Sequence, residues 1–156
     1  MDDILKIELQ EKSGHNDLSF CIKDLTGDLS FDTYYFGLAI EPVENFQEIK
    51  NCVADFLRHW VTQTETMQSG QSKYFPIDIS DQYTGCVKID KNGENLSVAY
   101  GHSKREGWKV NINNPINYFD SILDFENDSP KTIDVRQVDF VASIKKQIDE
   151  LKSERK

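Results

Sequence analysis

The sequence predicts a single α+β domain, residues 1–156, in which one antiparallel β-sheet packs against a long amphipathic helix and a helix at the end of the chain. Three observations lead to this expectation. The length of 156 residues is that of one ordinary domain. Apolar residues alternate with period two over much of the chain, which is typical of half-buried strands. Two stretches, 45–68 and 139–151, instead repeat apolar residues at spacings of three and four, as amphipathic helices do.

The first part of the chain is predicted to form a meander of strands. Leu5, Ile7 and Leu9 alternate with polar residues, and the same alternation continues over 18–22 and 29–32 after turns that contain glycine or asparagine. Residues 34–40 are apolar on both faces, which predicts a strand covered on both sides and ended by Pro42.

The strongest local pattern predicts a helix over 45–68. Asn45 and Glu48 have the spacing of a capping box at its start, and Gly70 offers the left-handed conformation that often follows a helix. The apolar positions recur over more than five turns: Phe46, Ile49, Val53, Phe56, Leu57, Trp60, Val61 and Met67.

Period two returns after this helix and predicts further strands over 73–79, 83–90, 95–103 and 108–112. Pro76 indicates an edge strand or a bulge, and Asn92-Gly93 is the dipeptide that type I′ hairpin turns select. Asn114-Pro115 is typical of a helix start, residues 132–138 have the pattern of a short edge strand, and Asp139 is expected to cap the last helix.

The charge is strongly negative and unevenly distributed. The net charge is −9, and residues 1–50 hold 11 acidic residues against four basic ones. This sign disfavours binding to nucleic acid or to an anionic membrane and favours a basic protein as partner, although acidity can also serve solubility alone. We expect the docking surface to be built from Asp17, Asp24, Asp28, Asp32, Glu41, Glu44, Asp78 and Asp81.

Few residues suggest chemistry, so we predict that the protein is not an enzyme and holds no cofactor. His102, in the polar segment 100–108, is the best candidate for an acid or base, with Ser103, Asp78 or Asp81 nearby, and an enzyme using it is the alternative. Residues 124–128 resemble the start of a calcium loop, but Ser129 and Val135 stand where an EF-hand requires glycine and glutamate, so no metal is expected.

The expected location is the cytoplasm. The three cysteines, 21, 52 and 86, form no Cys-x-x-Cys pair and suit a reducing compartment as free thiols. The first residues lack the basic and then apolar pattern of a signal peptide, and no apolar run approaches the length of a membrane span.

The segment 74–112 resembles small bacterial immunity proteins of polymorphic or contact-dependent toxin systems. The resemblance lies in Phe-Pro-Ile-Asp-Ile-Ser-Asp-Gln-Tyr-Thr-Gly, in the Asn-Gly hairpin and in Tyr-Gly-His-Ser-Lys-Arg-Glu-Gly-Trp. It implies a non-catalytic cytosolic inhibitor that binds a cognate toxin, and it transfers no site residues. We expect a monomer or a weak homo-oligomer. A structural subunit of a larger assembly is a third interpretation, which predicts a large exposed apolar patch.

Overall fold

The computed structural model describes residues 3–12 and 15–153, and it shows an α+β fold with antiparallel strand pairing. The strands form two sheets, so the prediction of a single sheet is wrong. One sheet has the order β1-β2-β3, with β1 at Leu5–Leu9, β2 at Leu18–Ile22 and β3 at Leu29–Phe31. The other contains β4 (Ser72–Ile79), β5 (Thr84–Asn92), β6 (Asn95–Ser103), β7 (Glu126–Asn127) and β8 (Ile133–Arg136), where β7 and β8 both pair with β6.

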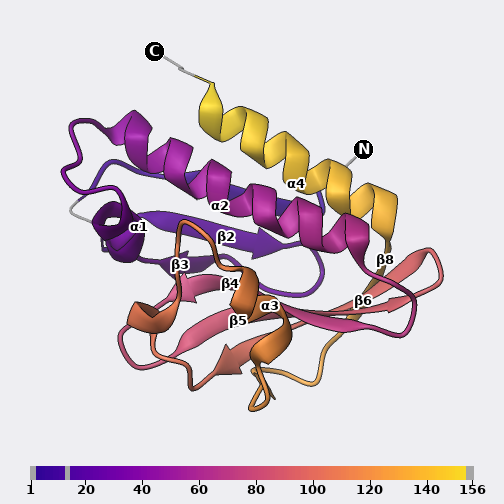
Figure 1. The fold of residues 1–156 in the computed structure, drawn as a ribbon. Helices are drawn as coiled ribbons and strands as arrows, with labels where there is room; N and C mark the ends of the chain where they lie inside the picture. The colour runs from indigo at the N-terminus through magenta and orange to yellow at the C-terminus, as the bar shows by residue number, and fades with distance from the viewer. Residues whose placement is uncertain (1–2, 13–14, 154–156) are drawn as a thin grey trace.

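The two long helices lie side by side over the three-stranded sheet, and the five-stranded sheet lies below it (Figure 1). These helices are α2 (Phe46–Thr66) and α4 (Gln137–Lys152), and they run antiparallel. The Gln47 side chain donates to the carbonyl of Leu151 at 3.0 Å, and the Gln137 side chain donates to the carbonyl of Thr64 at 2.7 Å. The other helices are short: α1 (Tyr34–Ala39) and α3 (Ile116–Ser121).

Several predicted elements are confirmed. The Asn45 side chain accepts from the amide of Glu48, and the Glu48 carboxylate accepts from the amide of Asn45, which completes the capping box of α2. The β4 strand is at the sheet edge, with a register shift between Pro76 and Asp78, so both roles proposed for Pro76 apply. The short strand β8 also forms. The cap predicted at Asp139 is wrong, because α4 begins at Gln137 with Arg136 in the N-cap position, and Asp139 lies in the first turn of the helix.

Three local predictions are wrong. Residues 34–39 form α1 rather than a strand, because a short apolar run has no period that separates the two structures. Residues 107–109 form a 3₁₀ turn, since the Gly107 amide donates to the carbonyl of Ser80 instead of extending the sheet, and Trp108 is 61% exposed. The β5–β6 hairpin forms, but its two-residue loop is Gly93-Glu94 and only Gly93 has positive φ, as in a type II′ turn.

Trp60 joins α2 to both sheets. Its ring is fully buried and meets Phe20 of β2 edge-on at 6.4 Å and Phe75 of β4 edge-on at 5.4 Å. Its indole nitrogen donates to the carbonyl of Pro76 at 3.2 Å, at the point where the register of β4 shifts. Trp60 therefore supplies a hydrogen-bond donor to a backbone carbonyl inside the core, next to the irregular part of β4.

Replacing Trp60 by phenylalanine is expected to lower the free energy of unfolding by about 1–3 kcal/mol, because a buried carbonyl loses its donor and the smaller ring leaves space. Trp108→Phe makes the same chemical change on the surface and is expected to stay within about 0.5 kcal/mol of the wild type. Urea unfolding of both variants measures the two effects. Equal losses would contradict the role assigned to Trp60.

Candidate functional site

A pocket of about 340 Å³ opens between the two sheets, and we name it the Asp78 pocket. The three-stranded sheet contributes two apolar side chains from β3. In the five-stranded sheet, β4 and β6 contribute a carboxylate and two ring side chains, β5 contributes a glycine, and the residues just before β5 and just after β7 contribute a phenol and a second carboxylate. The pocket exists because the strands divide into two sheets, one of which covers part of the other. Its lining residues are Leu29, Phe31, Asp78, Tyr83, Gly85, Tyr100, His102 and Asp128.

Strand register brings the polar residues of this pocket into one row. Gly85 of β5 pairs with Asp78 of β4 on one side and with His102 of β6 on the other. Residues directly opposite each other on paired strands have side chains on the same face of the sheet. The row therefore presents Asp78 and His102 on one face, with a glycine between them.

The missing side chain of Gly85 is what leaves the floor of the pocket open. A Cβ at this position would lie 2.5 Å from the Tyr100 hydroxyl and 2.7 Å from the Cβ of Asp78, so only glycine fits without displacing its neighbours. The Tyr100 ring stacks against Phe31 at 6.4 Å, and burial raises the pKa of its phenol. The hydroxyl of Tyr100 forms no hydrogen bond with the described residues.

Asp78 is a buried carboxylate without a cationic partner among the described residues. It is 9% exposed, and its Oδ1 accepts from the Ser80 hydroxyl at 2.9 Å. Burial raises the pKa of Asp78, and the charges of Asp32 and Asp128 add to this rise, whereas the hydroxyls of Ser80 and Tyr83 oppose it. A carboxyl with a raised pKa in a cavity is a common mark of a functional site.

His102 is held by two carboxylates at the rim of the pocket. Its Nδ1 lies 2.7 Å from Asp128 and its Nε2 lies 3.8 Å from Glu126, and Tyr83 meets its ring edge-on. His102 and Asp78 are both candidates from the sequence, and the structure brings them into one pocket. Ser103 is buried and bonded to the Tyr118 hydroxyl at 3.0 Å, so it is not a nucleophile at this site.

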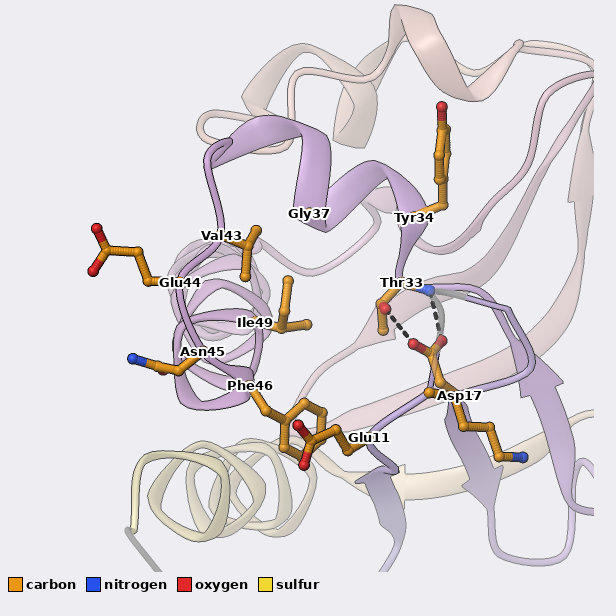
Figure 2. Close-up of a pocket in the computed structure, with 11 residues that line it drawn as sticks. Glu11, Asp17, Thr33, Tyr34, Gly37, Val43, Glu44, Asn45, Phe46 and Ile49 are labelled. Atoms are coloured by element: carbon orange, nitrogen blue, oxygen red, sulfur yellow. Dashed lines mark hydrogen bonds between the residues drawn. The ribbon is translucent and has the colours of Figure 1, made fainter.

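A second hollow, of about 410 Å³, lies between α1 and the start of α2 (Figure 2). Its wall includes Val43, Phe46 and Ile49. The Asp17 carboxylate turns toward Thr33, where it accepts from the backbone amide at 2.9 Å and from the hydroxyl at 2.5 Å. Glu44 points away from this hollow. At the start of α2 the capping box occupies the amides of Asn45 and Glu48.

The exposed apolar side chains gather around α1. Of the eight large hydrophobic side chains that are exposed in the described residues, six lie in α1 or in segments next to it. The Tyr35 hydroxyl donates to Asp81, the Gly107 amide donates to Ser80 and the Asn113 side chain donates to Ala39, and these bonds bring three segments together. The six are Tyr34, Leu38, Val43, Tyr83, Trp108 and Ile116.

Carboxylates accompany these aromatic residues. Glu106 accepts from the Trp108 indole at 2.6 Å, which lowers the pKa of Glu106, and the bond to Asp81 raises the pKa of Tyr35 to about 12. Asp32 accepts from the Asn16 amide at 2.7 Å and lies 3.5 Å from His15. We name this region the α1 face and define it by Asp32, Tyr34, Leu38, Glu41, Val43, Glu44, Asp81, Tyr83, Glu106 and Trp108.

The eight acidic residues expected to form one docking surface fall into three groups. Asp17 and Asp78 are buried, and their carboxylates accept hydrogen bonds from the hydroxyls of Thr33 and Ser80. Asp24 and Asp28 are exposed but precede β3, at the end opposite to Asp32. The remaining four belong to the region defined as the α1 face. Asp32 precedes α1, Glu41 and Glu44 follow it, and Asp81 is bonded to Tyr35 of α1. The sequence pattern does not reveal Tyr34 and Trp108 as surface residues, because both lie in stretches that it assigns to strands.

The comparisons with known proteins add no identification. No protein-family model, no curated protein and no solved structure matches the chain. Within residues 3–12 and 15–153, no cluster of three or more histidine, cysteine, aspartate or glutamate side chains could hold a metal ion. Among the same residues, no helix has the length and apolar character that crossing a membrane requires.

The raised pKa of Asp78 predicts a pH-dependent effect of Asp78→Asn. As pH rises above 3.8, the ordinary value, the unfolded chain loses this proton before the folded chain does, so the wild type loses stability until the raised pKa is passed. Asparagine carries no such penalty and can still accept from Ser80. The stability of the variant relative to the wild type is therefore expected to be more favourable at pH 7 than at pH 3.

Urea unfolding at the two pH values measures this change. Asp28→Asn removes an exposed carboxylate with the same change in charge and serves as the matched control. If Asp78→Asn becomes less stable relative to the wild type as pH rises from 3 to 7, the folded protein favours the ionised carboxylate. That result would show that burial does not raise the pKa of Asp78.

Proposed function

We propose that the chain is a binding protein, an immunity-type inhibitor that neutralises a cognate toxin by docking on it through the α1 face. The observation that carries the proposal is that exposed Tyr34, Tyr83 and Trp108 lie beside carboxylates in the segments around α1. Tyrosine and tryptophan are enriched among the residues that supply most of the binding energy at protein interfaces. The resemblance of residues 74–112 to immunity proteins points in the same direction.

The chemistry of the α1 face favours a basic partner. Asp32, Glu41, Glu44 and Asp81 add to a net charge of −9, which would accelerate the encounter with a positively charged protein. The aromatic side chains would then supply the short-range contacts. In this arrangement the carboxylates mainly set the association rate, and the aromatic residues mainly set the dissociation rate.

The Asp78 pocket favours a second candidate, a small enzyme. Asp78 with its raised pKa could act as an acid, and His102 lines the same cavity. However, the pocket contains no serine, cysteine or lysine that could act as a nucleophile, and His102 already faces two carboxylates. The third interpretation, a structural subunit, would use the same exposed aromatic residues but does not require a basic partner.

The binding proposal is tested by a growth assay with the protein encoded next to this chain's gene. That protein is expected to arrest growth when expressed alone and to lose this effect when the chain is co-expressed. Tyr34→Ala and Trp108→Ala are each expected to weaken the complex at least about tenfold, because each removes an aromatic anchor. Binding is measured by calorimetry with the purified proteins.

The matched control for these truncations is Val138→Ala. Val138 is 60% exposed, and it lies at the start of α4, at the opposite end of the molecule from α1 (Figure 1). Its truncation is expected to leave both growth protection and affinity unchanged. A neighbouring protein that neither arrests growth nor binds the chain contradicts the proposal, as does a complex that is insensitive to both aromatic truncations.

The contribution of charge is tested by two double variants with the same change in net charge. Asp32→Asn with Asp81→Asn removes two carboxylates from the α1 face, and Asp24→Asn with Asp28→Asn removes two from the loop before β3. The first pair is expected to slow association with the toxin several-fold at low salt, and the second pair much less. Stopped-flow measurements at two salt concentrations give the rates. Equal slowing by both pairs would argue against a localised acidic surface.

A further inference from the structure

We propose that the Asp78 pocket binds a cationic side chain of the partner, the guanidinium of an arginine or the ammonium of a lysine. This inference rests on the proposed function, because the cation would come from the protein that the chain inhibits. It adds a specific anchoring site to the broader α1 face.

The first support is the unbalanced charge of the pocket. Asp78 is nine-tenths buried, and no described lysine, arginine or histidine side chain lies within ion-pair distance of it. The groups that stabilise its charge are the hydroxyls of Ser80 and Tyr83, which are neutral. Carboxylates this buried are rare unless they are paired. A cation entering the pocket would supply the missing pair.

A second carboxylate lies at the rim of the same cavity. Asp128 lines the pocket and uses Oδ1 to contact His102 at 2.7 Å. Asp32 is close enough that its charge acts on Asp78. Two carboxylates therefore line the space, against one histidine, and the charge of Asp32 adds to theirs from outside the pocket. This balance opposes an anion and favours a group that can donate several hydrogen bonds at once, as guanidinium and ammonium groups do.

The walls of the pocket suit the apolar stem of such a side chain. Leu29 and Phe31 lie on one side, and the Tyr100 ring stacks on Phe31. Aromatic rings attract cations through their faces, and arginine and lysine both carry long methylene stems that pack on apolar surface. The Tyr100 hydroxyl, which has no partner among the described residues, adds an oxygen that can accept a hydrogen bond at the open position above Gly85.

The location of the pocket connects it with the α1 face. Tyr83 is exposed, lines the Asp78 pocket and belongs to the α1 face, so the pocket opens beside the proposed interface. Asp81, two residues before it, is bonded to Tyr35 of α1. Anchors that fill a pocket within a larger contact area are typical of tight protein complexes, and arginine is among the residues most often used.

The test uses small probes in place of the partner. N-acetyl-arginine amide, N-acetyl-lysine amide and the neutral isostere N-acetyl-citrulline amide are titrated into the ¹⁵N-labelled protein, and amide shifts are followed by NMR. The cationic probes are expected to give saturable shifts at Gly85, Tyr100 and His102, whereas citrulline gives none. The cationic probe with the higher affinity identifies the preferred head group. Equal shifts with citrulline, or no saturable shift with either cation, overturn the inference.

Two carboxylate variants connect the shifts to the pocket. Asp78→Asn is expected to weaken binding of the cationic probe at least about tenfold, because a charge-assisted contact is lost. Asp28→Asn makes the same change in net charge outside the pocket and is expected to bind the probe like the wild type. Equal affinities of the two variants overturn the inference. Unchanged spectra away from the pocket confirm that each variant is folded.

The outcomes separate this inference from the proposed function. If a toxin binds through Tyr34 and Trp108 but the pocket binds neither cationic probe, the inference is overturned and the inhibitor proposal stands. If the pocket binds the cationic probes but the chain binds no toxin, the inhibitor proposal is contradicted. The pocket would then be a cation site whose ligand comes from a molecule other than a toxin.

Discussion

The position of Trp60 at the junction of α2 and the two sheets is the constraint on which the rest of the structure depends. The indole donates to the carbonyl of Pro76 at the point where β4 contains a bulge, and the ring packs against Phe20 and Phe75 at the same time. The two sheets share no strand, so side-chain packing must set their relative placement. A large aromatic residue with one hydrogen-bond donor is suited to this task.

The bulge that Trp60 stabilises also shapes the Asp78 pocket. A bulge inserts an extra residue into one strand and changes which residues oppose each other beyond it. In β4 it brings Asp78 opposite Gly85, and Gly85 in turn faces His102. The core contact and the polar row are thus two results of one irregularity in the strand. The side that faces α2 is closed by aromatic rings, and the end beyond the bulge stays open and polar.

Sequence patterns were sufficient where one local interaction decided the structure. The capping box of α2 and the β5–β6 hairpin depend on residues close together in the chain, and both formed. Patterns failed at α1, because its short apolar run has no period that separates helix from strand, and at Gly107, whose amide bonds to the distant Ser80. The same limit applies to the candidate site. The sequence indicates His102 and Asp78 separately, but only the register across Gly85 shows that they share a cavity.

The helix α4 closes the free edge of β1, although more than 130 residues separate them in the chain. Ser143 accepts from the Leu5 amide at 2.9 Å and donates to its carbonyl at 3.3 Å, and Gln147 accepts from the Ile7 amide at 3.0 Å. An open strand edge is a template for pairing with other chains. During synthesis on the ribosome this edge stays uncovered until α4 has emerged, so it gains its protection against self-association only after all the strands of both sheets have been made.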